Sequence, residues 1–186
     1  TAQGGAGMNL AGGAGTIYIK TNGNSPAWVL VDNGGQLGTN TPLSILNSLP
    51  ASVGLALRHG AIGSAGLSSD LQSLLIDSGA SLLAPGPSYI NVNHDALVDT
   101  NGAILSDAAG SNPGTNPGRG SVDDFGNGSG GGYGGAGGAS LFGAADGATF
   151  GSSNQPASLG GAGGVSPALA GYSQGGGAIH LTVGGK

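Results

Sequence analysis

The sequence contains no cysteine and no glutamate, and only four of its 186 residues are lysine or arginine. Without cysteine, disulfide bonds and thiolate metal sites are excluded. The scarcity of strong helix formers such as Glu, Lys and Met excludes a helical bundle. A net charge of −5 with so few cations disfavours nucleic-acid binding. No run approaches the roughly 18 apolar residues that a membrane-spanning helix needs, so we expect no membrane insertion.

Glycine takes the place of the missing residue types, with 43 of 186 residues, against roughly 7% in average proteins. It keeps no three-residue period, which excludes a collagen triple helix. Glycine is densest between residues 126 and 138, where it occupies nine of thirteen positions. The chain carries no signal-peptide pattern, so we expect a mature chain or a piece excised from a longer protein.

Short runs with alternating apolar residues indicate β-strands, because side chains in a strand point to opposite faces with a period of two. Alternation of this kind predicts that one face of each strand is buried. The pairs that show it are Ile17/Ile19, Val29/Val31, Leu74/Ile76 and Ile90/Val92.

A short motif recurs: an apolar residue, Asp, a small polar residue, Gly, and a return to apolar residues. The copies are Val31–Leu37, Ile76–Leu82, Val98–Ile104 with one inserted residue, and a weaker one at Leu57–Ile62. Asp32 and Asp77 are 45 residues apart, about twice the 22 residues between Asp77 and Asp99. A fixed period of this size is typical of repeat architectures. Asp can cap a tight turn, and Gly can adopt a positive φ there. The predicted turn positions are Asp32, Gly34, Asp77, Gly79, Asp99 and Gly102.

These patterns predict an all-β fold, a parallel β-helix or β-solenoid-like domain with a long Gly-rich insertion. We expect one domain over residues 1–186, with coil-forming strands in 16–106, the insertion in 107–177 and a closing strand at 178–183. The insertion is open to three interpretations: a loop packed on the solenoid, extended polyglycine-type strands, or partial disorder. Four aromatic residues there are expected to anchor it to a core: Tyr133, Phe142, Phe150 and Tyr172.

Three segments carry a resemblance to a class of known proteins: Gly13–Lys20, Val29–Gly35 and Tyr133–Gly138. They resemble the Gly-rich, right-handed parallel β-helix repeats of large secreted bacterial surface proteins, such as adhesins and autotransporter passengers. The resemblance implies an extracellular or cell-surface module with a structural or adhesive role, and it brings no catalytic residues with it. The long Gly-rich stretch before the last strand departs from a regular β-helix.

Two patterns suggest acid chemistry. Leu75–Ser81 is similar to the active-site strand of retroviral-type aspartic proteases, with Leu141–Gly143 as an apolar partner motif, and such enzymes need two Asp that share a proton. Alternatively, Asp77, Asp99 and Asp107 stacked in one column would supply the acids of a carbohydrate-cleaving β-helix. Because Asp recurs in turn after turn, turn capping explains these residues more simply.

Other residues suggest binding. Asp123, Asp124 and Asn127 form an oxygen-rich loop of the kind that suits Ca²⁺, although no cofactor is required. The three histidines, His59, His94 and His180, would bind a metal only if they converged. Exposed aromatic side chains can stack on sugars, and the candidates for this role are Tyr18, Trp28 and Tyr89.

The sequence therefore predicts a non-enzymatic structural or adhesive module, extracellular or at the cell surface. Its partners would be neighbouring repeats or copies of itself, joined into filaments through open solenoid ends, and surface glycans. The alternative prediction is a carbohydrate-binding or carbohydrate-cleaving β-helix, followed by an aspartic-protease-like protein.

Overall fold

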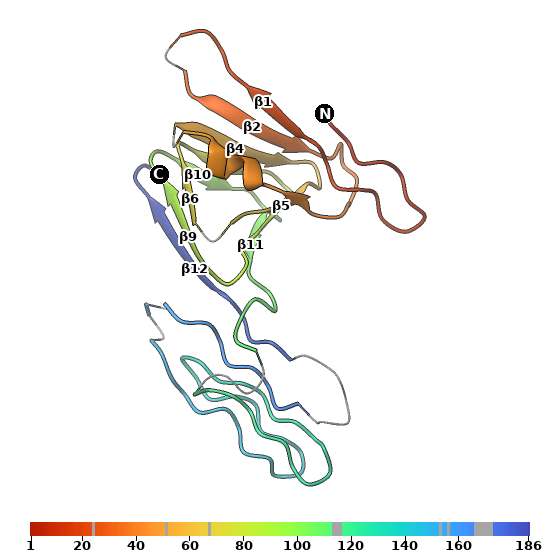
Figure 1. Ribbon diagram of the computed structural model, residues 1–186, viewed down its shortest axis with the longest axis vertical. Coiled ribbons are helices and arrows are strands. Elements are labelled where there is room, and N and C mark those ends of the chain that lie inside the picture. The colour runs from red at the N-terminus through yellow and green to blue at the C-terminus, as the bar shows by residue number, and fades with distance from the viewer. Residues whose placement is uncertain are drawn as a thin grey trace. The chain divides into compact units, whose positions relative to one another are not determined.

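The computed structural model describes residues 1–23, 25–50, 52–66, 68–112, 117–152, 154–155, 157–165 and 173–186. The chain is almost all β, with 31% strand and 3% helix, and its parallel sheets form a β-solenoid of about four turns (Figure 1). The predicted fold class is therefore confirmed. Within the described residues, no helix has the length and apolar character needed to cross a bilayer.

The strands form three sheets. The first sheet has the order β1-β2-β4-β7-β10, the second β11-β8-β5-β3 and the third β12-β9-β6. The strands of the first sheet are β1 (Thr16–Ile19), β2 (Ala27–Asp32), β4 (Val53–Arg58), β7 (Leu74–Ile76) and β10 (Ala96–Val98). Those of the second are β3 (Thr41–Pro42), β5 (Ile62–Ser64), β8 (Ser81–Leu83) and β11 (Ala103–Leu105). Those of the third are β6 (Ser68–Leu71), β9 (Pro87–Val92) and β12 (Ala178–Val183), and a 3₁₀ helix, η1 (Ser44–Ser48), follows β3.

Successive strands of a coil belong to successive sheets, and coil 1 has strands in the first two sheets. Coil 1 holds β2 and β3, coil 2 holds β4, β5 and β6, coil 3 holds β7, β8 and β9, and coil 4 begins with β10 and β11. In the first sheet Val31 pairs with Leu57, Leu57 with Ile76, and Ile76 with Val98. Along this column the chain advances by 26, 19 and 22 residues per coil. The weak fourth copy of the motif, at Leu57, is thus a true coil.

The core consists of apolar residues stacked coil upon coil. In the first sheet the inward positions Val31, Leu57 and Ile76 are fully buried. Leu82 in the second sheet and Ile90 in the third are buried as well. The alternation predicted for β2, β7 and β9 is confirmed, because every second side chain there is buried.

Strand β1 differs from the prediction. It pairs antiparallel with β2, and Tyr18, opposite Val29, shares the core-facing side of the sheet. Ile17 and Ile19 therefore lie on the outer side, where Ile19 is 42% exposed. The prediction that this pair is buried was wrong, because β1 extends the sheet beyond coil 1 and the core does not continue beneath it.

The first coil is covered by the N-terminal segment. Ala11 forms a parallel bridge with Gly38. Ala14 is buried, and its carbonyl accepts a hydrogen bond of 2.6 Å from the Thr41 hydroxyl. The N–H of Gly4 donates to Oδ1 of Asn33. This end of the solenoid is therefore capped by the chain itself.

Strand β12 joins the third sheet from far along the sequence. It neighbours β9, and two backbone bonds keep one offset: Ala178 N–H to Gly86 C=O, and Gly184 N–H to Val92 C=O. A constant offset is the mark of a parallel pair. Strand β12 thus takes the third-sheet position of coil 4, and the Gly-rich segment lies between the second and third strands of that coil.

The contacts within the chain group its residues into two compact units. The solenoid unit comprises Thr1–Ala84, Tyr89–Leu105 and Leu181–Lys186, and the glycine unit comprises Pro85–Ser88 and Ser106–His180. Each unit is described by itself below.

The glycine unit is a bundle of extended backbone segments. Segment 128–132 is hydrogen-bonded to four others: Ser129 N–H to Ser121 C=O, Gly130 N–H to Gly138 C=O, Gly147 N–H to Gly130 C=O, and Gly161 N–H to Gly132 C=O. A β-strand has two such neighbours, whereas an extended helix with three residues per turn can bond in several directions. Of the three interpretations left open by the sequence, the extended polyglycine-type segments agree with this pattern.

Glycine is required in this bundle because the segments touch backbone to backbone. A Cβ added at Gly131 would collide with the carbonyl of Gly161, and one added at Gly164 with the carbonyl of Ser121. Neither glycine has a positive φ, so steric crowding, not backbone conformation, selects glycine there. Main-chain atoms therefore make the packing contacts in this bundle, whereas side chains make them in the solenoid.

The aromatic residues predicted to anchor this segment differ in burial. Tyr133 and Phe150 are half-buried and meet edge to face, with ring centroids 5.1 Å apart. Phe142 is 60% exposed, so the prediction that it anchors the segment was wrong: its loop turns it outward. Tyr172 lies outside the described residues.

Candidate functional site

The predicted turn residues lie where first-sheet strands end. Tight turns there are closed by the N–H of Gln36, Ala61, Ala80 and Gly102, each bonded to the carbonyl three residues earlier. The carboxylates of Asp32, Asp77 and Asp99 cap these turns, accepting hydrogen bonds from the N–H of Gly34, Ser78 and Thr100.

Gly34 and Gly79 have positive φ, as the motif predicts, but Gly102 does not. In the fourth turn Asn101 adopts the positive φ of 64° instead. Glycine is favoured at position 102 for another reason, since a Cβ there would lie 2.9 Å from the carbonyl oxygen of Ile76.

These turns bring ionisable side chains into one column, which we call the turn column: Asp32, Arg58, Asp77 and Asp99 in successive coils. The Arg58 Nε lies 3.3 Å from Asp77 Oδ2. His59, beside Arg58, places its Nδ1 3.1 Å from Asp32 Oδ2. The sequence motif reveals the three acids and, in its weaker copy at Leu57–Ile62, places Arg58 at the Asp position, whereas the contact of Arg58 with Asp77 is found only in the structure.

Within the turn column, Asp32 and Asp77 have polar or charged partners. Burial of Asp32 favours its neutral form, but the hydrogen bond from the Gly34 N–H and the contact with His59 outweigh it and lower the pKa of Asp32. Asp77 is engaged by Arg58 and by the Ser78 N–H. These are structural contacts, unlike the shared proton of an aspartic protease. Asp107 was predicted to lie in the same column as Asp77 and Asp99. It follows β11, at a different corner, and belongs to the glycine unit, so that prediction was wrong.

We expect acid to weaken the solenoid through Asp32. Because its folded-state pKa is lowered, the stabilisation is present at neutral pH and disappears as the pH falls below about 4. Asp32→Asn is expected to lower the free energy of unfolding by about 1–2 kcal/mol at pH 7. This cost should become progressively smaller as the pH falls toward 3, where the wild-type carboxylate also becomes protonated. Urea unfolding of both proteins from pH 7 to pH 3 measures this, and an equal cost at both ends would contradict it.

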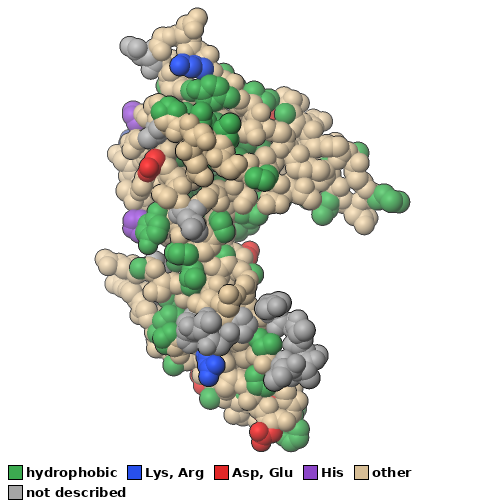
Figure 2. Space-filling view, viewed as in Figure 1, with side chains coloured by type: hydrophobic (Ala, Val, Ile, Leu, Met, Phe, Trp, Pro, Cys, Tyr) green, Lys and Arg blue, Asp and Glu red, His purple; other side chains and the backbone are tan. Residues whose placement is uncertain are grey.

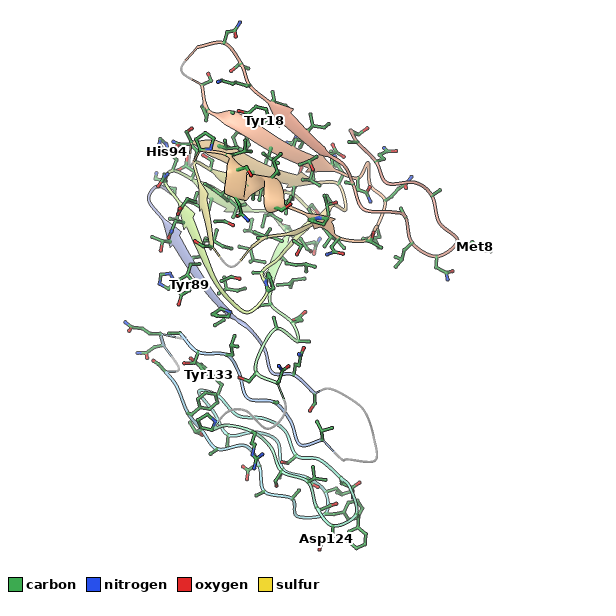
Figure 3. The ribbon with its side chains drawn as sticks, viewed as in Figure 1. Met8, Tyr18, Tyr89, His94, Asp124 and Tyr133 are labelled. Carbon is green, nitrogen blue, oxygen red and sulfur yellow. The ribbon has the colours of Figure 1, made fainter. Side chains whose placement is uncertain are left out.

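The loop predicted as a calcium site is held by its own hydrogen bonds. Asp123 Oδ1 accepts from the N–H of Phe125 and of Asn127, and Asn127 Nδ2 lies 3.1 Å from Asp123 Oδ2. Burial opposes ionisation here, but these donors lower the pKa of Asp123. Asp124 is exposed on the same loop (Figure 3). Both carboxylate oxygens of Asp123 therefore accept hydrogen bonds within the loop, and calcium binding there stays a prediction.

The histidines do not form a metal site in the part of the chain that the structure describes, where no three His, Cys, Asp or Glu side chains gather. His59 lies in the turn column. His94 follows β9, and His180 belongs to β12.

The three aromatic candidates do not share a platform. Tyr18, 46% exposed on β1, lies on the core-facing side of the first sheet. Trp28 lies on its outer side and covers Gly54, where a Cβ would come within 2.7 Å of the indole. Tyr89 lies on β9, in the third sheet, and is 48% exposed (Figure 3).

In the part of the chain that the structure describes, no strand follows coil 4 in the first sheet, and the Lys186 carbonyl accepts a hydrogen bond from the Ala96 N–H at the start of this edge. Strand β10 of coil 4 is the last of the first sheet, and its Leu97 and Val98 are 58% and 42% exposed. Figure 2 shows how sparse charged side chains are on one face of the molecule. Val98 occupies the position in its column at which Val31, Leu57 and Ile76 are fully buried, so a further coil would bury it.

Sequence reasoning missed two features of the glycine unit. One is an exposed apolar pair on neighbouring loops, Phe125 and Phe142, whose rings lie 6.4 Å apart. The other is a pocket of about 310 Å³ beside Tyr133. Neither has a signal in the sequence, because segments distant in the chain meet there.

Comparison with known proteins gives no relative from which a function can be carried over: no family model, no curated protein and no solved structure matches this chain.

Proposed function

We propose that this chain is a non-enzymatic structural and adhesive module, extracellular or at the cell surface, whose solenoid associates through coil 4. The observation that carries the proposal is the outer edge of β10, where Leu97 and Val98 are exposed beyond the Ala96 N–H, which is bonded to the Lys186 carbonyl. An edge strand with free backbone groups is a template for another strand.

The residues of this edge favour association. Ala96, Leu97 and Val98 carry no charge and include no proline, the usual means of blocking an edge. Pairing would add one rung to the column of Val31, Leu57 and Ile76. The natural partner is a coil of the same kind, from a neighbouring repeat or from a second copy.

The two ends of the solenoid differ, and this determines the product. The N-terminal end is covered by residues 1–15 and by β1, whereas Leu97 and Val98 are exposed on coil 4. Contact between two coil-4 ends gives a closed dimer, and contact between coil 4 and the outer edge of β1 gives a filament. Electron microscopy together with light scattering distinguishes a dimer from a filament.

Val98→Lys tests the proposal. A lysine there would be buried without a partner in the paired state, so we expect association to weaken by roughly tenfold or more. Ile45→Lys is the matched control, since Ile45 on η1 is also exposed, at 44%, and lies away from β10. Sedimentation over a range of concentrations gives the affinities. A wild type that stays monomeric at high concentration, or equal affinities for both variants, would count against coil-4 pairing.

A further inference from the structure

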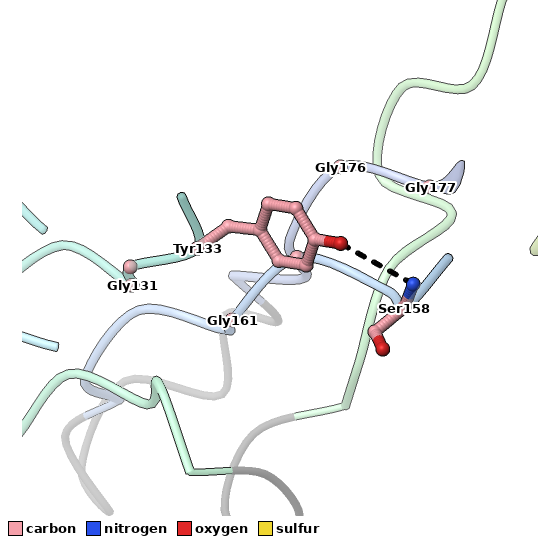
Figure 4. Close-up of a pocket in the computed structure, with 8 residues that line it drawn as sticks. Gly131, Tyr133, Ser158, Gly161, Gly176 and Gly177 are labelled. Atoms are coloured by element: carbon pink, nitrogen blue, oxygen red, sulfur yellow. Dashed lines mark hydrogen bonds between the residues drawn. The ribbon is translucent and has the colours of Figure 1, made fainter. Parts of the chain in front are cut away.

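The pocket beside Tyr133 lies within the glycine unit and is lined almost entirely by main chain (Figure 4). Its volume is about 310 Å³, near the lower limit of roughly 300 Å³ for small-molecule sites. Its lining residues are Gly131, Gly132, Tyr133, Ser158, Gly160, Gly161, Gly176 and Gly177.

The only side chains larger than hydrogen in this lining belong to Tyr133 and Ser158. The Ser158 N–H donates a hydrogen bond of 3.3 Å to the Tyr133 hydroxyl oxygen (Figure 4). That oxygen acts as the acceptor, so the phenol proton remains available to donate to a ligand. The ring is held by edge-to-face packing against Phe150. Tyr133 is therefore fixed in position before any ligand arrives, which reduces the entropy cost of binding.

The composition of the lining restricts the ligand. It includes no charged side chain, so it offers an ionic ligand no opposite side-chain charge to offset the loss of hydration. It offers one aromatic ring, two hydroxyl groups and peptide groups. A ligand that matches this set has an apolar ring surface for the aromatic side chain and several hydroxyls for the polar groups. A neutral saccharide has both.

Packing explains most of the lining glycines but not Gly176. A Cβ at Gly131 or Gly161 would collide with neighbouring carbonyls, as elsewhere in the bundle. A Cβ at Gly176 would meet no atom within 4 Å, and its φ is not positive. Neither crowding nor conformation requires glycine at this position, so a larger side chain at Gly176 would have open space to extend into beside the pocket.

We propose that this pocket is a binding site for one ring of a neutral saccharide, with Tyr133 as the stacking and hydrogen-bonding side chain. The site is independent of coil-4 association, because all its residues belong to the glycine unit. It would give the module a means of attaching to glycans that the solenoid itself does not provide.

Saturation-transfer NMR on the full chain tests the site, with glucose, galactose, mannose and N-acetylglucosamine as probes and glucuronic acid as the charged comparison. We expect at least one neutral sugar to bind and glucuronic acid to bind more weakly. Gly176→Val fills the pocket and should weaken binding by roughly tenfold or more. Tyr133→Phe keeps the ring and removes the hydroxyl, so a partial loss is expected.

Gly138→Val is the matched control, because a Cβ at Gly138 also meets nothing within 4 Å and Gly138 does not line the pocket. It should bind like the wild type, and thermal melts show that both valine variants are folded. The proposal is overturned if no neutral sugar binds, if only glucuronic acid binds, or if Gly176→Val binds as well as Gly138→Val. Coil-4 association is measured separately by sedimentation, so failure of either proposal leaves the other standing.

Discussion

Replacing Leu57 with alanine is expected to lower the free energy of unfolding of the solenoid unit by about 3 kcal/mol. Leu57 is fully buried and is paired with Val31 on one side and Ile76 on the other. Removing three carbons from a packed core loses their transfer free energy and leaves a cavity, which together cost about 2–5 kcal/mol. Because each coil contacts only its neighbours, a cavity in coil 2 weakens the packing of coil 2 against both coil 1 and coil 3.

Urea unfolding followed by circular dichroism measures this effect. Leu37→Ala is the control, since Leu37 is also a leucine and is 67% exposed; its cost should stay within about 0.5 kcal/mol. Equal costs for the two variants would mean that the stacked column does not carry the stability of the solenoid.

Replacing Gly164 with alanine is expected to disrupt the glycine unit. The added Cβ would overlap the carbonyl of Ser121 and approach Gly128. Both neighbours are main chain held by hydrogen bonds and cannot swing aside like a flexible side chain. Overpacking typically costs 1–3 kcal/mol, and we expect about 3 kcal/mol or more in this case. Gly138→Ala, where a Cβ has open space, should be neutral or slightly stabilising.

Cleavage by trypsin measures directly whether the glycine unit is disrupted. Arg119 is the only lysine or arginine between residues 106 and 180, and it lies between Gly118 and Gly120, both buried. The Gly120 N–H is bonded to the Ala162 carbonyl, so an intact bundle protects the bond after Arg119. Cleavage there should accelerate strongly in Gly164→Ala and remain slow in Gly138→Ala. Equal rates in the two variants would contradict backbone-to-backbone packing.

The sequence predicted the solenoid because its signal is local. Alternation at Val29/Val31 and Leu74/Ile76 determines which side chains face inward, and an Asp-containing turn follows each of these strands. The 45-residue spacing between Asp32 and Asp77 was correctly read as two coils, although their lengths are unequal. The last strand, Ala178–Val183, also lies where its alternation indicates.

The candidate site was harder to predict from sequence, because its geometry depends on which segments become neighbours. The weaker motif copy aligns Arg58 with Asp32 and Asp77. The contacts themselves, Arg58 with Asp77 and His59 with Asp32, depend on how coils of 26 and 19 residues stack. Asp107, which was also expected in the column, follows β11 and lies at another corner.

By itself, the sequence determined an all-β, coil-forming protein with little charge, because side-chain alternation and turn residues act over a few positions. Only the tertiary structure decided that β1 runs antiparallel, that β12 joins coil 4, and that a pocket forms beside Tyr133. The physical reason is the same in each case. Glycine has no side chain whose chemistry could indicate which segment it will contact. Strand edges pair through backbone groups that every residue carries. The partners of these segments are therefore determined by the folded arrangement as a whole.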